Sequence, residues 1–437
     1  MRENKSYLNI LQHIIDVKKN ELAAVCWAFL YIFVLFIAYY VMRPIRDELG
    51  VAGGVDNLSW LFIGTLVAMV ALNPLYAYAT KRWPREKFIA ITYRFFIANL
   101  IIFFILLGNA TPEQQIWIGR AFFIWVSVFN LFVVSVYWSV VVDVFDAEQG
   151  KRLFSFLAAG ATLGGITGSA LTSGLVEYLG QKNLLLLAAV LLEIAIFAAR
   201  KLSRLNVQEI KDIETTGASK SIGGSLFSGF THTLRSPYLM GISAFILLNS
   251  VTSTFLYFQQ SEIAEANFTD RAARTAFFAN IDLWVNALTL IFQLYLAGKL
   301  LKSTSVTLVL CSLPFISILG FTTLAFIPSI TLLVIVQVAR RVSNFGLSRP
   351  TREILFTSIS REDRYKAKNF IDTVVYRGGD QVGSWSYAGL GALGLGIAGI
   401  SIAAIPISVI WLSVSYWLGR EHIKSNSPNL QQQGIII

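Results

Sequence analysis

Seven arginines lie inside apolar stretches that are long enough to cross a bilayer, and those stretches contain no lysine. They are Arg94, Arg120, Arg340, Arg341, Arg349, Arg352 and Arg377. A guanidinium at the centre of a bilayer costs several kcal/mol, so such a residue usually faces water or a partner. Its planar fork also binds phosphate or carboxylate through two parallel hydrogen bonds. An arginine-rich interior of this kind is typical of a site for anions.

Arg341 and Arg352 share one face of the tenth apolar stretch if that stretch is a regular α-helix. Their spacing leaves them about 20° apart around the axis and about 16 Å apart along it, with Asn344 about 60° to the other side. This separation would bracket the two ends of an anion the size of a nucleotide. Gly346 and Pro350 lie between them, and a kink there would free backbone groups to contact the anion. Alternatively, both arginines pair with acids on neighbouring helices.

Two further arginines have an acid at helical spacing. Arg349 precedes Glu353 by four residues, and Arg377 precedes Asp380 by three. Such pairs form ion pairs on one helix face, which is the structural interpretation. In the functional interpretation, Arg349 binds the substrate, and Glu353, Arg377 and Asp380 take part in coupling or gating of transport.

Arg120 and Arg94 lie near the edges of their stretches. Arg120 either marks the outer membrane interface or contributes to the anion site. Arg94 lies one or two turns from the inner edge of its stretch, and we expect its side chain to extend to the membrane surface.

A second basic group follows the first apolar stretch. Arg43, Arg46 and Asp47 come directly after Tyr39 and Tyr40, at the outer end of the expected helix. Aromatic and basic residues favour that depth, so an interfacial cap would explain them. We instead expect Arg43 and Arg46 to bind substrate and Asp47 to take part in coupling or gating, because this segment resembles a family element described below.

Two acids also lie inside apolar stretches. Asp282 and Glu193 are functional-site candidates on that ground alone. Without a nearby cation, such an acid would couple transport to protons. Paired with Arg341 or Arg352, Asp282 would instead be an internal placeholder that the cargo displaces.

The composition excludes a soluble enzyme. Of the 437 residues, 55% are hydrophobic and 14% are charged, and the mean hydropathy is +0.61. The net charge of +10 reflects basic residues that collect in cytoplasmic loops, so we expect no nucleic-acid partner. The cysteines and histidines suggest no disulfide or metal site, and we expect no cofactor. The chain also has no H-E-x-x-H, G-x-S-x-G or G-x-x-x-x-G-K-[ST] motif for hydrolysis or ATP-driven pumping.

The hydropathy pattern predicts an all-α integral membrane protein with twelve transmembrane helices. The predicted spans are 22–42, 58–79, 88–108, 116–142, 153–177, 183–199, 238–259, 276–298, 304–327, 329–358, 372–395 and 397–418. On this topology, inner segments carry 24 basic residues and outer loops carry five, namely Arg43, Arg46, Lys182, Arg271 and Arg274. Both termini are therefore expected in the cytoplasm.

A polar segment and a weak repeat divide the chain. The predicted parts are an amphipathic cytoplasmic helix (1–20), a six-helix half (21–199), a cytoplasmic linker (200–237), a second six-helix half (238–418) and a cytoplasmic tail (419–437). Matches at an offset of 214 residues relate the halves, for example Asn130 with Asn344 and Phe156 with Phe370. Because six is even, the halves are parallel repeats. This arrangement resembles the major facilitator superfamily.

Three segments carry a closer resemblance. Residues 78–87 form a short basic loop that resembles the one superfamily members have there. Residues 39–48 resemble the K-P-L-R-D element of the ATP/ADP translocase family, the nucleotide transporters of plastids and obligate intracellular bacteria, with Arg43 where that element has lysine. Residues 361–380 resemble the loop that leads into that family's eleventh span. The resemblance covers nearly the whole chain.

The resemblance implies a secondary transporter that exchanges organic anions, nucleotides or other phosphorylated metabolites, by alternating access. We expect a monomer in a bacterial inner membrane whose partners are a small anion and the lipid bilayer. The alternative is a proton-coupled exporter of metabolites or drugs, with Asp282 or Glu193 as the proton carrier and the arginines as structural residues.

Overall fold

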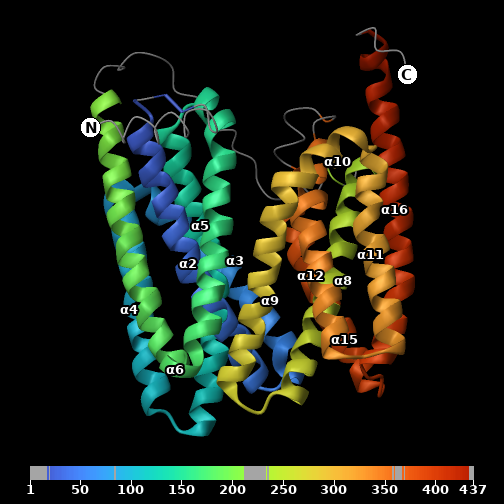
Figure 1. The fold of residues 1–437 in the computed structure, drawn as a ribbon, viewed down its shortest axis with the longest axis horizontal. Coiled ribbons are helices and arrows are strands. Elements are labelled where there is room, and N and C mark those ends of the chain that lie inside the picture. The colour runs from blue at the N-terminus through green and yellow to red at the C-terminus, as the bar shows by residue number, and fades with distance from the viewer. Residues whose placement is uncertain are drawn as a thin grey trace. The chain divides into compact units, whose positions relative to one another are not determined.

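The computed structural model describes residues 17–18, 20–82, 85–210, 233, 236–356, 359, 367–368 and 370–432, and nearly all of them are helical (Figure 1). In chain order the elements are α2 (Leu22–Ala52), η1 (Val55–Asn57), α3 (Leu58–Arg82), α4 (Arg85–Asn109), α5 (Pro112–Val144), α6 (Ala147–Ile210), α8 (Pro237–Asn267), α9 (Arg271–Phe292), η2 (Gln293–Ala297), α10 (Gly298–Ser303), α11 (Val306–Phe326), α12 (Ile330–Ser343), η3 (Asn344–Ser348), α13 (Arg349–Leu355), η5 (Ile371–Val375), α15 (Tyr376–Ala392) and α16 (Ile397–Gln432). Most of the predicted helix at 1–20 and the middle of the predicted linker lie outside the described residues.

Ten described helical stretches are long and apolar enough to span a membrane. One of them, in α6, contains two predicted spans that meet at Gly180, where the backbone has φ +72°. Only glycine adopts this conformation readily, so the chain reverses there. The predicted eleventh span corresponds to η5 and the 17-residue α15. The expectation of an all-α integral membrane protein is confirmed.

Helix α2 is longer than predicted and extends through Ala52. Its 31 residues make a helix about 46 Å long. Arg43 and Arg46, which we placed in an outer loop, therefore lie within the helix. The helix continues because Asp47 and Glu48 are buried against partners described below.

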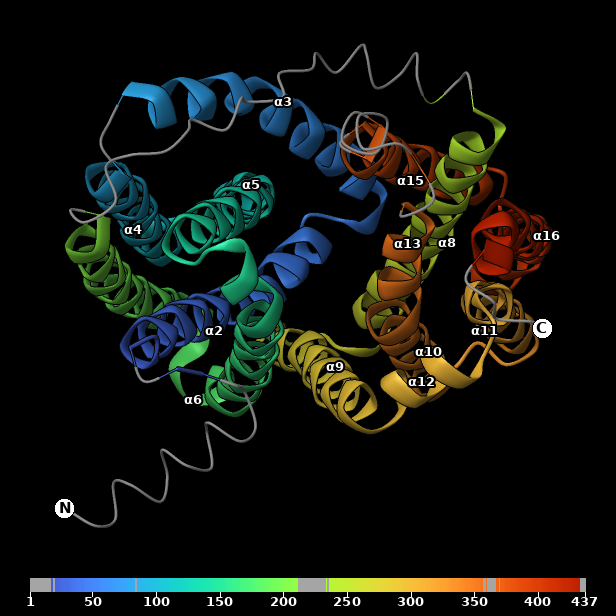
Figure 2. The same cartoon turned by 90° about the horizontal axis from the view of Figure 1, so that it is seen from above.

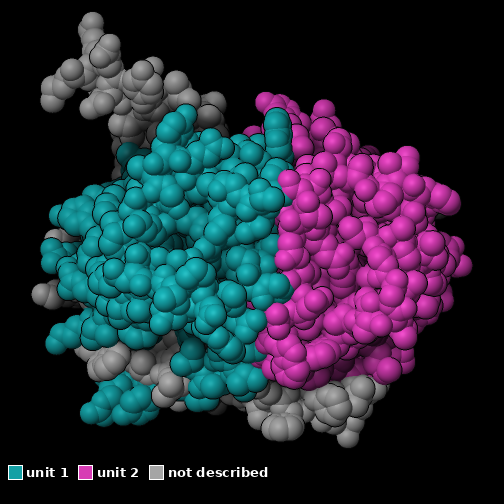
Figure 3. All heavy atoms as spheres, turned by 90° about the horizontal axis from the view of Figure 1, so that it is seen from below, with its two compact units in different colours: residues 1–54, 64–219, 268–287 teal, residues 55–63, 220–267, 288–437 magenta. Residues whose placement is uncertain are grey.

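The described residues form two compact units, which Figure 3 colours separately. Unit 1 comprises residues 1–54, 64–219 and 268–287, and unit 2 comprises residues 55–63, 220–267 and 288–437. In unit 1, α2 packs against α5 and α6, and α4 packs against α6 (Figure 2). In unit 2, α8 contacts α15 and α16, and α16 also packs along α11.

Glycines bring two helix pairs into close contact. A Cβ atom at Gly168 of α6 would lie 2.6 Å from the Ile37 carbonyl oxygen of α2, and one at Gly164 would collide with the Phe33 carbonyl. In unit 2, a Cβ atom at Gly383 of α15 would lie 3.1 Å from the Val251 carbonyl oxygen of α8. Glycine suits these positions because small residues let helices approach closely.

Three π-helical turns, η2, η3 and η5, interrupt the described helices of unit 2. The internal repeat has an offset of 214 at Phe156 and Phe370, before η5, but the equivalent glycines Gly168 and Gly383 are 215 apart. The π-turn η5 lies between these two pairs of residues, so the shift coincides with an irregular turn of the helix. The second repeat thus differs from the first at the start of α15.

Candidate functional site

Arg43 and Asp282 form an ion pair between α2 and α9 within unit 1. Arg43 Nη1 lies 2.7 Å from Asp282 Oδ1, and the two side chains are 18% and 3% exposed. The guanidinium also lies 5.7 Å from the centre of the Tyr40 ring. The sequence leaves Asp282 either isolated or paired with Arg341 or Arg352, but the structure places it against Arg43. A buried carboxylate thus neutralises a candidate anion ligand.

Arg46 lies against Asp47 and helix α5. Its Nε donates to Asp47 Oδ1 at 2.9 Å, and its Nη1 is 3.5 Å from the Ser127 hydroxyl. The guanidinium lies 4.9 Å from the centre of the Phe123 ring. Arg46 is therefore held toward α5.

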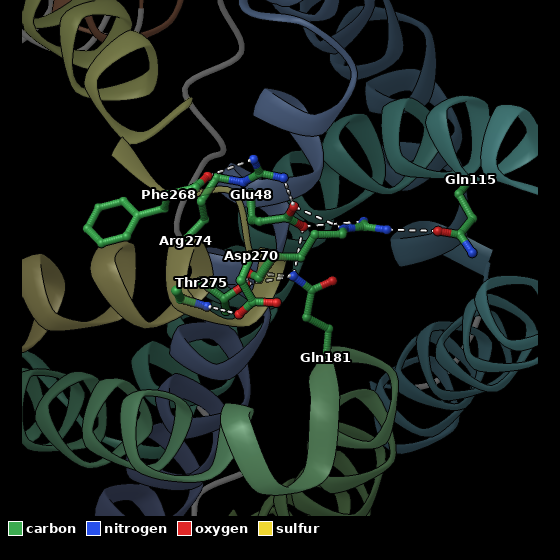
Figure 4. A network of polar contacts seen from close by, with 9 residues as sticks. Glu48, Gln115, Gln181, Phe268, Asp270, Arg274 and Thr275 are labelled. Atoms are coloured by element: carbon green, nitrogen blue, oxygen red, sulfur yellow. Dashed lines mark hydrogen bonds and ion pairs between the residues drawn. The ribbon is translucent and has the colours of Figure 1, made fainter. Parts of the chain in front are cut away.

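Glu48 is the centre of a larger polar network (Figure 4). Its fully buried carboxylate accepts hydrogen bonds from Arg271 Nε at 3.0 Å, Arg274 Nη2 at 3.1 Å and Gln181 Nε2 at 2.7 Å. Arg271 also donates to Gln115 Oε1 at 2.8 Å. The start of α9 is thereby connected to α2, α5 and α6 within unit 1.

Glu48 belongs to the resembled element at 39–48 but is not among the site residues that the sequence predicts. The available signal was the density of charge, since Arg43, Arg46, Asp47 and Glu48 lie within six residues. In a helix that stays buried, each of these charges needs a partner. The partners Arg271 and Gln181 are far away in the sequence, so local spacing could not predict their contacts with Glu48.

Arg120 connects the start of α5 to the end of α2. Its Nη2 donates to the Gly53 carbonyl at 3.2 Å, and its guanidinium lies 4.6 Å from the centre of the Trp117 ring. Gly53 is the C-cap of α2, so Arg120 satisfies a carbonyl at a helix end.

Arg94 and Glu193 form an exposed pair away from these groups. Their closest atoms are 3.4 Å apart, and the side chains are 56% and 50% exposed. Glu193 is therefore not a buried acid, in contrast to what its position in the sixth apolar stretch suggested.

Among the described arginines of unit 2, Arg340 is the most deeply buried, at 2% exposure. Its Nε donates to the Ser317 hydroxyl at 3.0 Å, and its Nη2 donates to the Thr252 hydroxyl at 2.7 Å and the Asn249 carbonyl at 3.0 Å. The Trp411 ring centre lies 5.7 Å from its guanidinium. Among the described residues, its hydrogen bonds go to neutral groups alone.

The π-turn η3 separates Arg341 from Arg349. Asn344 begins this turn, so the tenth span is not the regular α-helix that the 20° calculation assumed. Arg341 and Asn344 are half-buried, whereas Arg349 is exposed and lies 4.7 Å from the centre of the Phe345 ring. An extra residue in η3 changes the face that Arg352 presents relative to Arg341.

Arg352 lies between two carboxylates. Its Nη2 is 3.2 Å from Asp372 Oδ1 and 3.7 Å from Glu353 Oε1, and its side chain is 19% exposed. Glu353 also pairs with Lys368. Arg352 Nε is buried and has no hydrogen-bond partner among the described residues.

The predicted pair in the eleventh span is present. Arg377 Nη1 lies 3.3 Å from Asp380 Oδ2, as expected from their spacing. Asp380 also accepts a hydrogen bond from the Ser250 hydroxyl of α8. Asp380 thus connects this ion pair to the neighbouring helix α8.

Comparison with known proteins assigns the family. The family model described as Major Facilitator Superfamily matches residues 24–367. The chain belongs to the major facilitator superfamily. It is therefore a secondary transporter and not an enzyme, and it acts on a small solute. No curated protein sequence matches the chain.

Solved structures of transporters share this fold. A bacterial homologue of the iron transporter ferroportin, in an inward-facing state, has a TM-score of 0.64 at 12% identity and covers 93% of this chain and 99% of its own. A POT family transporter in complex with 5-aminolevulinic acid has a TM-score of 0.61 at 13% identity, with coverages of 93% and 96%. A bacterial homologue of the human lysosomal transporter Spinster has a TM-score of 0.56 at 14% identity, with coverages of 94% and 99%.

Proposed function

We propose that this superfamily member transports an organic anion, specifically a nucleotide or another phosphorylated metabolite. The observation that carries the proposal is the excess of arginine in unit 2. The segments Ile330–Leu355 and Ile371–Ala392 contain five arginines but only three carboxylates. Arginines therefore outnumber carboxylates by two in these membrane-spanning segments, and this charge balance favours an anionic substrate.

The geometry of individual side chains supports this proposal. Arg349 is exposed and lies near the Phe345 ring, and the N–H fork of a guanidinium in such a position can bind an oxyanion. Arg352 has a buried Nε–H without a described acceptor. A buried donor of this kind is costly unless something accepts from it. In unit 1, Arg43 and Arg46 are candidate anion ligands in their own right.

The same excess of charge favours exchange of one anion for another during alternating access. A net positive charge within membrane-spanning segments opposes the closure of an empty transporter. A bound anion would remove that cost, so loaded transporters should reorient faster than empty ones. The nucleotide assignment is supported by the resemblance at residues 39–48, and a bacterial inner membrane with both termini in the cytoplasm remains our proposal for location.

The alternative of a proton-coupled exporter has less support. Its proposed proton carriers, Asp282 and Glu193, each lie beside an arginine. Neither carboxylate is the isolated buried acid that this mechanism was based on.

Thermal stabilisation of the purified protein tests the proposal. We expect ATP, ADP, phosphate or a sugar phosphate to raise the melting temperature, whereas uncharged sugars should not. A ligand present at 100 times its Kd adds about 2.7 kcal/mol of stability. Arg341→Ala and Arg352→Ala should lose this shift, and Arg94→Ala, which removes an exposed arginine, should retain it. The absence of a shift with every phosphorylated compound, together with no counterflow in liposomes, would refute the proposal.

A further inference from the structure

In the ion pair between Arg43 and Asp282, the carboxylate accepts a hydrogen bond from a guanidinium donor that an anionic substrate could also use. Asp282 Oδ1 lies 2.7 Å from Arg43 Nη1, a distance typical of a strong charge-assisted hydrogen bond. Substrate phosphate or carboxylate oxygens would form the same bond with the same guanidinium. An anion therefore cannot take this position on Arg43 without displacing the carboxylate of Asp282.

We propose that Asp282 is a built-in competitor of the transported anion for Arg43. This inference rests on the proposed function, because it assumes that Arg43 binds the anion. In the empty transporter the carboxylate neutralises Arg43, and the arriving anion replaces it. When the anion leaves, Asp282 returns to the guanidinium and hinders rebinding.

Two consequences follow from this competition. First, the apparent affinity for the anion is lower than Arg43 alone would provide, because the ion pair must be broken. Second, the empty transporter does not have to bury an unpaired Arg43 when it reorients, and burying an unpaired charge is strongly unfavourable. Asp282 should therefore permit some net transport alongside exchange.

The backbone around Asp282 is held by contacts that do not use its carboxylate. Asn280 Oδ1 accepts a hydrogen bond from the Ser173 hydroxyl at 2.8 Å. The start of α9 is attached through the Glu48 network, and Asn286 packs against Gly165 of α6. Loss of the Asp282 charge should therefore leave α9 in place.

Asp282→Asn is the decisive variant, because asparagine keeps the size of the side chain and removes the charge. We expect the Kd for ATP, ADP or inorganic phosphate to fall roughly tenfold, as expected when a competing ion pair of about 1.4 kcal/mol is removed. In proteoliposomes loaded with labelled ADP, the ratio of exchange to net efflux should rise. Asp282→Glu, which retains the carboxylate, should resemble the wild type.

A double variant separates competition at Arg43 from an indirect effect. Arg43→Gln/Asp282→Asn should bind the anion no more tightly than Arg43→Gln. Glu193→Gln removes an acid from the exposed pair in the same unit and should change neither measurement. Asp282→Ser provides a second neutral variant if the asparagine variant does not elute as a single species.

The outcomes distinguish this inference from the proposed function. If wild-type protein binds and exchanges phosphorylated anions but Asp282→Asn and Asp282→Ser have unchanged Kd values and flux ratios, the competitor role is wrong and the proposed function stands. Tighter binding that persists in the Arg43→Gln background would also overturn it. If wild-type protein binds none of ATP, ADP and phosphate, the proposed function fails and this inference fails with it.

Discussion

At the scale of single residues, Glu21 shows how partners outweigh burial. It is the N-cap residue of α2 and is only 5% exposed. Burial disfavours its carboxylate, but hydrogen bonds from Arg152, the Lys18 backbone N–H and Gln149 outweigh that effect and hold its pKa below the ordinary value of 4.5. The carboxylate therefore stabilises the folded state when it is ionised.

This shift predicts the pH dependence of a Glu21→Gln variant. Because the folded-state pKa is lowered, the stabilisation is complete above pH 4.5 and is lost as the pH falls through the folded-state pKa. At pH 7 we expect the variant to melt about 2–6 °C below the wild type, and the gap should narrow at acidic pH. Melting curves in detergent between pH 7 and pH 3.5 measure this. Glu148→Gln, at an exposed position of α6, should show no such gap, and a gap for Glu21→Gln that is independent of pH would contradict the explanation.

Local spacing predicted side-chain contacts only within one helix. The pair Arg377 and Asp380 follows from an i,i+3 spacing, because residues three apart are neighbours on a helix surface. The partner of Asp282 could not be predicted in this way. Arg43 is 239 residues away, and its contact with Asp282 depends on how α2 and α9 pack.

At the scale of elements, the distance of each glycine from the neighbouring helix should determine whether an added methyl group is tolerated. At Gly164 of α6 a methyl group would meet the Phe33 carbonyl, whereas at Gly174 of the same helix nothing lies within 4 Å. Gly164→Ala should therefore destabilise the protein by about 1–3 kcal/mol through overpacking. Gly174→Ala should stabilise it by about 0.5–1 kcal/mol, because alanine favours the helix. Denaturation of the two purified variants compares these effects, and equal stabilities would contradict the close contact of α2 with α6.

The helices themselves could be predicted more completely than their internal irregularities. Apolar length alone predicts spans such as α4 and α11, since a bilayer requires about 20 apolar residues. The π-turns η3 and η5 could not be predicted, because one extra residue hardly changes the hydropathy pattern. The candidate site contains both of these turns, so its side-chain geometry was the least predictable part.

At the scale of the whole molecule, the distribution of basic residues predicts a topology that labelling can test. With the N-terminus inside, Thr111 between α4 and α5 and Tyr178 before Gly180 lie outside, whereas Asp146 between α5 and α6 lies inside. All three side chains are exposed. The prediction also requires α6 to cross the membrane twice, with its reversal at Gly180 on the outer side.

Single cysteines in a protein without Cys26 and Cys311 measure this topology. In intact cells, a membrane-impermeant maleimide should label Thr111→Cys and Tyr178→Cys but not Asp146→Cys, and permeabilised cells should show labelling at all three positions. Labelling of Asp146→Cys alone in intact cells would mean that the termini lie outside and that the basic residues were assigned to the wrong face. Labelling of Thr111→Cys without Tyr178→Cys would mean that the first part of α6 does not cross. Because an even number of spans keeps the two halves in the same orientation, a failure at α6 would also remove the basis for treating them as parallel repeats.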